Sequence, residues 1–387
     1  MAHWRHAPKS GLISSYALPR PLLGAAGRQA LHWVHEDGRI ERWGRLSFLG
    51  GARTHLEAPG IDLLCNGALP WCLAPLRSEG FLGRLLAQRL AVHGLDRDPA
   101  RWPIEHALFA AMQAQDAPGA LMLGEPRDAS GALSDTGDYD SLADDVARTL
   151  PAGSSAGGEQ AKFLTRRADG AAVLVKFSPP RGTPFGARWH DLLHAEALAL
   201  QVLAEHGVPV AAARVVETPR RTYLESLRFD RIGARGRRHA VPLWAAHEAF
   251  VPEPRQHWGA SCEALVAQRR LPPEASAQVH ALRHFGHLIG NTDMHFGNLS
   301  LWVAPDDVAA GRFTLAPLYD MLPMRWRPDA STGALDWLPF TPQTIALQSP
   351  ARILATTFWR RAAALRALST GFRGLAQEML ARLAPPP

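Results

Sequence analysis

A lysine in the middle of an apolar strand is the feature of this sequence that most constrains its fold. The stretch Val173-Leu174-Val175-Lys176-Phe177 has the composition of a buried strand, and a strand buried on both faces disfavours an unpaired charge. The chain otherwise uses arginine as its cation, because its only lysines are Lys9, Lys162 and Lys176. A retained lysine indicates a pocket that needs a compact ammonium group. We therefore expect Lys176 to be buried against a carboxylate; the alternative is an edge lysine that extends to water.

The helix that follows contains a matching carboxylate. We predict this helix over Leu192 to His206, with Asp191 as its N-cap and its end before Pro209. On a period of about 3.6 residues, Glu196 falls within the apolar stripe of the helix. A buried carboxylate needs a cation, so Glu196 is expected to pair with Lys176; the alternative places Glu196 at the rim of the stripe, in water. A strand lysine paired with a helix glutamate holds the phosphates of ATP in protein kinases.

A polar loop, residues 292–298, follows a second predicted helix over Ser276 to Ile289. The loop leads into a hairpin predicted over residues 299–316. Because a hairpin brings its two ends together, Asn298 and Asp320 should lie side by side. An amide oxygen and a carboxylate placed in this way are suitable ligands for Mg²⁺.

Asp293 lies at the tip of this loop, where it can accept the proton of an attacking hydroxyl. The spacing from Asp293 to Asn298 equals that of the protein-kinase catalytic loop, and Asp320 corresponds to the magnesium aspartate of those enzymes. The alternatives are a loop-capping role for Asp293 and a helix N-cap role for Asp320. With Lys176 and Glu196 in the same order along the chain, the set predicts ATP- and Mg²⁺-dependent phosphate transfer to a hydroxyl.

These patterns predict an α+β chain with a two-lobed protein-kinase-like fold, in which the N-lobe is small and mixed and the C-lobe is mainly helical. We assign residues 1–126 to an N-terminal α+β subdomain and residues 127–150, rich in Asp, Ser and Gly, to a polar linker. Residues 151–232 are predicted as the N-lobe core with a Gly/Ser nucleotide loop. Residues 233–387 are predicted as the C-lobe with the catalytic loop and the metal-binding aspartate.

The composition argues against several other classes of protein. The formal charge of +6 comes from basic residues scattered among acids, so no direct nucleic-acid partner is expected. No apolar run approaches the length of a membrane span, about 18 residues. Cys65, Cys72 and Cys262 form no CxxC pair, which fits a reducing environment. We expect a cytoplasmic protein with no membrane contact.

Three motifs lie in the part of the chain that carries these residues. They are Ser154-Ser155-Ala156-Gly157-Gly158-Glu159-Gln160-Ala161-Lys162, Leu288-Ile289-Gly290-Asn291-Thr292-Asp293-Met294-His295-Phe296-Gly297-Asn298 and Leu315-Ala316-Pro317-Leu318-Tyr319-Asp320. Together they resemble the HipA-like serine/threonine kinases, toxins of bacterial toxin–antitoxin modules, over roughly residues 150–330. The resemblance implies a protein substrate, such as an aminoacyl-tRNA synthetase, and an antitoxin partner.

The same resemblance implies a role for each matching residue. Asp293 would be the catalytic base, and Asn298 and Asp320 would bind Mg²⁺. The residues implied to contact ATP are Ser154, Ser155, Gly157, Gly158, Gln160, Lys162, Lys176, Glu196, Glu225 and Leu227, the last two near the adenine hinge. Ser154 or Ser155 would match the loop serine that such kinases phosphorylate on themselves, and a phosphorylated loop would repel ATP.

Two positions depart from the ordinary kinase pattern. Met321 follows Asp320 where a glycine is usual, so an activation loop of the ordinary kind is not expected. His295 lies after Asp293, whereas ordinary kinases place a histidine before the catalytic aspartate. We keep His295 as a second candidate catalytic residue.

Other functions remain open at this point. A small-molecule phosphotransferase of the aminoglycoside-kinase type would share the lobes, but it should have a histidine two residues before the catalytic aspartate, where this chain has Asn291. A zinc hydrolase is a further alternative, with ligands from His280, His284, His287, Asp293 and His295. The three helical histidines lie opposite the apolar stripe, which is more typical of a solvated surface. The last alternative is a catalytically degenerate kinase fold that serves as a binding module.

Overall fold

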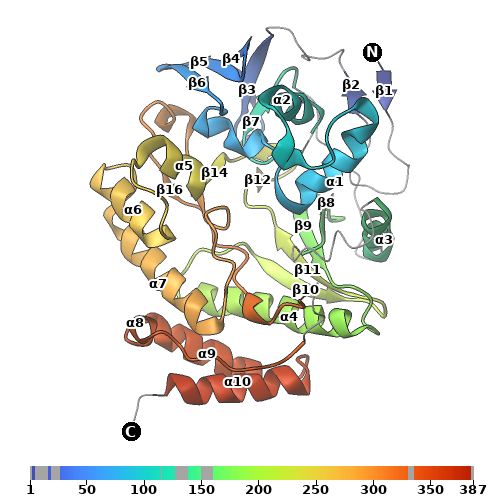
Figure 1. Cartoon of the computed structure of the whole chain (residues 1–387), viewed down its shortest axis with the longest axis vertical. Helices are drawn as coiled ribbons and strands as arrows, with labels where there is room; N and C mark the ends of the chain where they lie inside the picture. The colour runs from blue at the N-terminus through green and yellow to red at the C-terminus, as the bar shows by residue number, and fades with distance from the viewer. Residues whose placement is uncertain are drawn as a thin grey trace.

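The computed structural model describes residues 2–4, 16–18, 27–114, 116–126, 138–149, 160–329 and 335–384. Figure 1 shows an N-terminal domain at one end of the long axis, a small sheet with helix α4 (Pro184–Glu205) in the middle, and helices at the other end. Ser154, Ser155, Gly157 and Gly158 of the predicted nucleotide loop lie outside the described residues. The architecture is the α+β type that the sequence predicts.

An antiparallel five-stranded sheet forms the N-terminal domain. The elements are β1 (Ala2–Trp4), β2 (Tyr16–Leu18), β3 (Arg28–Val34), β4 (Ile40–Gly50), β5 (Arg53–Ala58), β6 (Ile61–Asn66), η1 (Trp71–Leu76), α1 (Gly80–Leu90), α2 (Ile104–Gln113) and β7 (Leu121–Leu123). Strands β6-β5-β4-β3-β7 are neighbours in that order. The turn between β3 and β4 contains Gly38, whose φ of +85° favours glycine. Leu31, Leu56 and Leu73 are fully buried in this domain.

A four-stranded antiparallel sheet forms the N-lobe. Its strands are β8 (Lys162–Arg166), β9 (Ala172–Phe177), β10 (Ala213–Glu217) and β11 (Thr222–Leu227), in the order β10-β11-β9-β8. The predicted strand that contains Lys176 is confirmed as β9, which lies between β11 and β8. Val173, Val175 and Phe177 pack in an apolar cluster on one face, and Lys176 points from the other face toward α4.

The prediction of a polar linker over residues 127–150 is wrong in its second half. Tyr139–Thr149 form helix α3, while residues 127–137 lie outside the described part of the chain. Tyr139, Leu142 and Val146 of α3 are buried in the same apolar cluster as the inner face of β9. The apolar residues recur at helical spacing among several aspartates, so the composition of this segment concealed an amphipathic helix.

Helix α4 begins earlier than predicted. Its N-cap is Thr183, whose Oγ1 accepts a hydrogen bond from the backbone N–H of Gly186 at 3.0 Å, and Pro184 stands in the first turn. Asp191, the predicted N-cap, is a buried residue inside the helix. Its carboxylate accepts hydrogen bonds from Ser369 N at 2.7 Å and Ser369 Oγ at 2.5 Å. These bonds attach α4 to the C-lobe.

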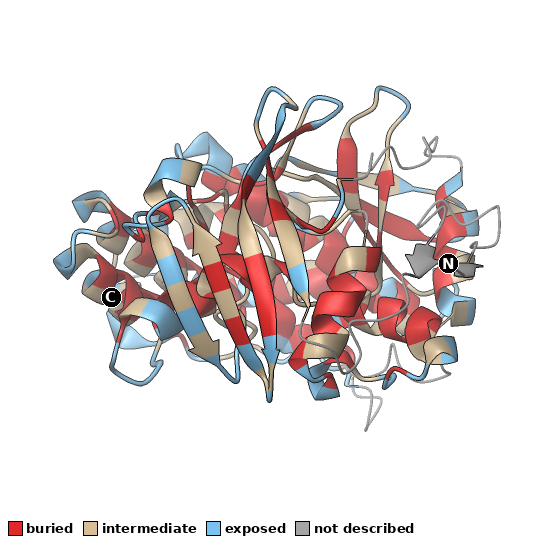
Figure 2. Ribbon diagram, turned by 90° about the horizontal axis from the view of Figure 1, so that it is seen from above, coloured by how far each residue is buried: buried red, intermediate tan, exposed pale blue. Residues whose placement is uncertain are grey.

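Helices make up most of the C-lobe. They are α5 (Leu243–Phe250), α6 (Trp258–Ala267), α7 (Pro273–Ile289), α8 (Thr344–Leu347), α9 (Ala351–Ala364) and α10 (Thr370–Leu383), beside the small sheet β14 (Ala240–Pro242), β15 (Ser300–Trp302) and β16 (Thr314–Leu315). Helix α7 ends at Gly290 as predicted, and the φ of that residue is +77°. Phe285, Trp359 and Phe372 are fully buried between α7, α9 and α10. Buried residues run through the interior of the molecule, and exposed residues gather at the turns (Figure 2). No helix in the described ranges is long and apolar enough to cross a membrane.

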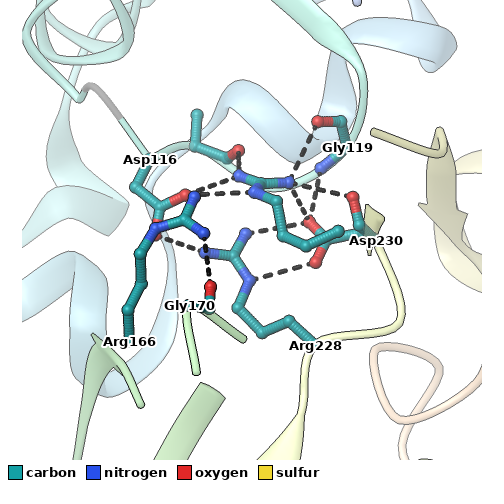
Figure 3. A network of polar contacts seen from close by, with 8 residues as sticks. Asp116, Gly119, Arg166, Gly170, Arg228 and Asp230 are labelled. Carbon is teal, nitrogen blue, oxygen red and sulfur yellow. Dashed lines mark hydrogen bonds and ion pairs between the residues drawn. The ribbon is translucent and has the colours of Figure 1, made fainter. Parts of the chain in front are cut away.

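A network of arginines and aspartates, in which Asp230 is buried and Asp116 is partly exposed, joins the N-terminal domain to the segment that follows β11 (Figure 3). Arg228 donates to both carboxylate oxygens of Asp230, at 3.0 and 2.9 Å, and pairs with Asp116 at 2.5 Å. Arg231 pairs with the same two aspartates at 2.7 Å each. The backbone N–H of Gly119 donates to Asp230 at 2.9 Å. Asp116 and Gly119 belong to the N-terminal domain, so the network holds that domain against the end of β11.

Candidate active site

Lys176 lies at the junction of the two lobes, between two carboxylates. Its Nζ is 2.6 and 2.7 Å from the two oxygens of Glu196 on α4, and 2.7 Å from Oδ1 of Asp320, which follows β16. Lys176 and Glu196 are 3% and 1% exposed, which confirms the predicted buried pair. The Asp320 side chain is 27% exposed, so the group opens to solvent on the Asp320 side.

The charges of Lys176 and Asp320 stabilise each other, whereas burial raises the pKa of Glu196. Burial alone would lower the pKa of Lys176, but Asp320 and Glu196 outweigh it and raise that pKa. Burial alone would raise the pKa of Asp320, but Lys176 and Lys162 outweigh it and lower that pKa. The ammonium and the Asp320 carboxylate are therefore both charged near neutral pH. Removal of one member would leave a buried, uncompensated charge.

Lys162 is the second lysine at this junction. Lys162 lies directly opposite Lys176 in the register of strands β8 and β9. Residues opposite each other on neighbouring strands point to the same face of a sheet. Its charge acts on both Glu196 and Asp320. Lys162 has no ion-pair partner among the residues that the structure describes. A second ammonium group therefore lies on the same face of the sheet as Lys176.

The loop after α7 is held in one conformation by two asparagines. Asn298 Nδ2 donates to the carbonyl oxygen of Asp293 at 2.8 Å, and the backbone N–H of Asp293 donates to Asn291 Oδ1 at 3.0 Å. Asn291 Nδ2 also lies 3.4 Å from the carbonyl oxygen of Asp320. Asn298 is 7% exposed, and it makes the bond to Asp293 through Nδ2, so its Oδ1 takes no part in that bond. Asn291 was not predicted as a site residue; its position directly after the helix-ending glycine is the signal that could have indicated it.

The predicted hairpin between Asn298 and Asp320 is confirmed. Strands β15 and β16 are antiparallel, with Leu301 opposite Leu315, and the N–H of Ala316 donates to the carbonyl oxygen of Ser300 at 3.0 Å. Strand β14 adds a third member to the sheet, which the sequence did not predict. The two ends of the hairpin therefore meet at the junction of the lobes.

Asp320 has an unusual backbone conformation. Its φ is +54°, which an aspartate tolerates at a cost on the order of 1 kcal/mol. The preceding residue anchors it, because Tyr319 OH donates to the carbonyl oxygen of Gly297 at 2.7 Å and lies 2.8 Å from Ser300 Oγ. A strained residue that is held by its neighbours indicates a functional requirement at Asp320.

Asp293 and His295 differ in how the structure uses them. The Asp293 carboxylate is half-buried, and within the described residues it makes no hydrogen bond or ion pair. The exposed His295 ring accepts a hydrogen bond through Nδ1 from the N–H of Gly297 at 3.0 Å, and its carbonyl oxygen accepts one from Trp258 Nε1 at 3.0 Å. Asp293 is therefore available as a proton acceptor, and His295 shapes the loop beside it.

Glu225 and Leu227 project away from Lys176. On β11, Leu224 lies opposite Lys176 and Glu225 lies opposite Val175, so the side chain of Glu225 is on the other face of the sheet. Its carboxylate accepts hydrogen bonds from Tyr139 at 2.7 Å and from Arg214 at 2.9 and 3.0 Å. Leu227 packs on the apolar cluster of the same face. A contact of either residue with adenine on the Lys176 face would use backbone atoms, and it stays a prediction.

Gln160 is the first described residue of the predicted nucleotide loop. Its Nε2 donates to the carbonyl oxygen of Phe177 at 2.7 Å, which attaches the start of β8 to the end of β9. Together with Lys162, it places the segment that leaves the Gly/Ser loop beside Lys176. The loop itself lies outside the described residues.

Comparison with known proteins identifies the family. Residues 154–384 match the HipA-like C-terminal domain, and residues 25–130 match the middle domain of YjjJ-like toxins. The chain belongs to the HipA-like toxin family. Toxin YjjJ of Escherichia coli (strain K12) is 33% identical, in an alignment that covers 94% of this chain and 85% of that protein.

The fold of this HipA-like chain is also that of a solved HipA. The HipA of Shewanella oneidensis MR-1, whose structure was determined with HipB and operator DNA, has a TM-score of 0.59 and 17% sequence identity. The match covers 92% of this chain and 96% of that one. The two-lobed, kinase-like α+β fold predicted from the sequence is thereby confirmed.

Proposed function

We propose that this HipA-like chain is an ATP- and Mg²⁺-dependent serine/threonine protein kinase that phosphorylates a protein hydroxyl. The observation that carries the proposal is the meeting of Lys176, Glu196 and Asp320 at the lobe junction, beside a loop that presents Asp293. A binding module without catalysis would have no need to keep this charged group together. The family and its fold support the same function.

The donor set suits Mg²⁺. Asn298 donates through Nδ2 to the loop and so orients Oδ1 as an acceptor, while Asp320 uses one oxygen on Lys176 and keeps the other. Both are hard oxygen ligands, and Mg²⁺ takes few protein ligands and keeps water or phosphate for the rest. The ion would neutralise charge on the transferred phosphate.

The chain's own residues then have distinct tasks. Lys176, fixed by Glu196, contacts the α- and β-phosphates of ATP, and Lys162 adds a second positive charge nearby. Asp293 accepts the proton of the serine or threonine hydroxyl. The hydroxyl oxygen forms its bond to the γ-phosphorus as the bond from that phosphorus to the bridging oxygen breaks. The products are ADP and a phosphorylated protein.

The family suggests the biological setting of this activity. A translation factor such as an aminoacyl-tRNA synthetase is the substrate class we propose, and an antitoxin protein is the proposed partner. HipA of Shewanella oneidensis was solved together with HipB, and YjjJ is named a toxin. We also propose that the chain phosphorylates itself at Ser154 or Ser155, because a phosphate in the nucleotide loop would repel ATP.

The test uses the purified full chain with γ-labelled ATP, with and without Mg²⁺, alone and with a bacterial extract. We expect labelled protein only with Mg²⁺. Asp320→Asn should lose nearly all labelling, because it removes the charged metal ligand. Asp307→Asn is the matched control, since Asp307 lies in the turn of the same hairpin and pairs with Arg312. Equal labelling by wild type and Asp320→Asn would contradict the proposal. Labelling of other proteins without any at Ser154 or Ser155 would remove only the self-phosphorylation.

A further inference from the structure

Two histidines of helix α4 meet a glutamate of strand β10 on the face of the sheet that α4 covers. His190 and His194 are one helical turn apart, and Glu217 ends strand β10. One ligand atom from each of the three lies within 4.8 Å of the other two. His194 Nε2 is 3.0 Å from Glu217 Oε1, and tetrahedral zinc ligands lie about 3.3 Å apart.

The backbone explains why these side chains converge. Residues four apart on a helix share a face, which places both imidazoles on the side of α4 that meets the sheet. Glu217 lies directly opposite Thr222 in the β10–β11 ladder, so both point to the same face of that sheet. Thr222 Oγ1 contacts His190 Nδ1 at 2.7 Å. Helix and sheet thus bring the three ligand groups to one place.

The hydrogen bonds of His190 leave one ring nitrogen able to bind a metal. Its Nε2 lies 2.8 Å from the carbonyl oxygen of Ala367, which can only accept, so Nε2 carries the proton. Nδ1 therefore has a free lone pair, which accepts the hydrogen bond from Thr222 in this structure. A ligating histidine whose other nitrogen donates to a backbone carbonyl is the usual supporting arrangement at metal sites.

We propose that His190, His194 and Glu217 bind one Zn²⁺ ion. Two imidazoles and one carboxylate are a ligand set that zinc takes, with a water molecule in the fourth position. Glu217 Oε2 pairs with Arg181 at 2.7 Å, which leaves Oε1 for the metal. The Arg181 guanidinium weakens the site, because it competes for the same carboxylate.

The position of the site gives the ion a structural task. His190 and His194 belong to α4, Glu217 belongs to the N-lobe sheet, and Ala367 lies in the turn before α10. A bound ion would therefore join α4 to the sheet, and the bond from His190 to Ala367 would continue the connection to the C-lobe. The same helix carries Glu196, so zinc would stabilise the part of α4 that holds Lys176.

The test treats the full chain with a chelator, removes the chelator, and titrates the protein with zinc in an isothermal calorimeter. Metal analysis of the dialysed protein then gives the number of zinc ions bound. We expect one equivalent of zinc for the wild type and a higher Tm with zinc than without. The double variant His190→Gln/His194→Gln should bind no zinc in the same range. The matched control is His280→Gln/His284→Gln, a pair at the same spacing on α7, which should bind like the wild type.

Two further variants separate a three-ligand site from weak capture by two histidines. Glu217→Gln keeps both imidazoles and should lower zinc affinity at least tenfold. Arg181→Gln should raise it severalfold, an outcome that a misfolded variant cannot produce. Wild-type affinity in His190→Gln/His194→Gln, or in Glu217→Gln, would overturn the proposal. So would an equal loss in the α7 control. None of these outcomes depends on phosphate transfer, so the test is independent of the proposed function.

Discussion

The ammonium of Lys176 lies 2.7 Å from a carboxylate oxygen of Asp320, so the strand lysine of the N-lobe and the proposed magnesium ligand of the C-lobe are in direct contact. In a complex with ATP and Mg²⁺, Lys176 would contact the phosphates and Asp320 would bind the metal. A bound nucleotide would therefore compete with Asp320 for the ammonium of Lys176. Glu196 contacts the same ammonium through both of its oxygens and gives Lys176 a second partner.

Lys176→Met is expected to abolish ATP-dependent labelling and to destabilise the fold. The variant leaves the buried Glu196 without its cation, which costs about 3–5 kcal/mol of unfolding free energy. Chemical denaturation measures the stability, and nucleotide binding can be measured by calorimetry. Lys162→Met is the control, because Lys162 has no ion-pair partner among the described residues: it should weaken ATP binding with little change in stability. A stable Lys176→Met variant would show that the pair is not buried as described.

Glu225→Gln should affect stability but not the use of ATP. The carboxylate accepts hydrogen bonds from Arg214 and Tyr139 on the face of the sheet opposite Lys176. Loss of its charge is expected to cost about 1–3 kcal/mol. The KM for ATP should change less than about threefold, which is less than the loss of one hydrogen bond to the nucleotide would cause. A large rise in KM without loss of stability would instead place the side chain at the nucleotide.

Asp230→Asn is expected to loosen the N-terminal domain. The substitution removes one of the two aspartates that neutralise Arg228 and Arg231, at a cost of about 3–5 kcal/mol for a buried pair. Thermal unfolding measures the change in Tm. Glu41→Gln is the control, since its pair with Arg39 is exposed and its loss should leave Tm unchanged. Similar Tm values for both variants would mean that the network of Figure 3 does not stabilise the domain contact.

His239 should make stability depend on pH. The imidazole is fully buried, and burial lowers its pKa to about 4 from an ordinary value near 6.5. Between these values the unfolded chain binds a proton that the folded chain does not. Stability is therefore expected to rise by up to about 1.4 kcal/mol per pH unit from pH 4 to 6.5 and to level off above.

His239→Gln tests this pH dependence. Glutamine can still donate to the carbonyl oxygen of Cys72 and accept from the N–H of Ala120, the two bonds that the imidazole makes at 2.8 and 3.1 Å. Its unfolding free energy should rise less steeply between pH 4 and 6.5 than that of the wild type. His287, whose pKa is also lowered to about 4 by burial, remains in both proteins and leaves a residual slope. Identical slopes would contradict the assignment to His239.

The sequence predicted the charged group well, because each member interrupts a local pattern. Lys176 breaks an apolar strand, Glu196 breaks an apolar stripe, and the hairpin relates Asn298 to Asp320 whatever its turn. The α3 helix was missed because its three aspartates give the segment a polar composition, although each of them is only partly exposed and pairs with an arginine elsewhere in the chain. The sequence predicts Asp191 as an N-cap because it stands just before the apolar residues of the helix. Its real partner is Ser369, a residue far along the chain that no local pattern indicates.

The His190, His194 and Glu217 cluster was missed for a related reason. The two histidines are visible at helical spacing in the sequence. The third ligand comes from a strand, and only the fold determines that this strand packs beside α4. The sequence drew attention to the histidines of α7 instead. Among the described residues, those do not gather with a third ligand group at the same short distance.

Asp293→Asn tests the central claim most directly. Asparagine has the size of aspartate but cannot take the proton of the attacking hydroxyl, while the lysines and proposed metal ligands stay unchanged. The measurement is the rate of phosphate transfer from labelled ATP to protein, together with ATP affinity, for wild type, Asp293→Asn and the exposed-turn control Asp306→Asn. We predict a loss of about 10²–10⁴-fold in transfer for Asp293→Asn, with ATP affinity kept and the control active. Transfer by Asp293→Asn at the wild-type rate would contradict the assignment of this chain as a kinase that uses the Asp293 loop.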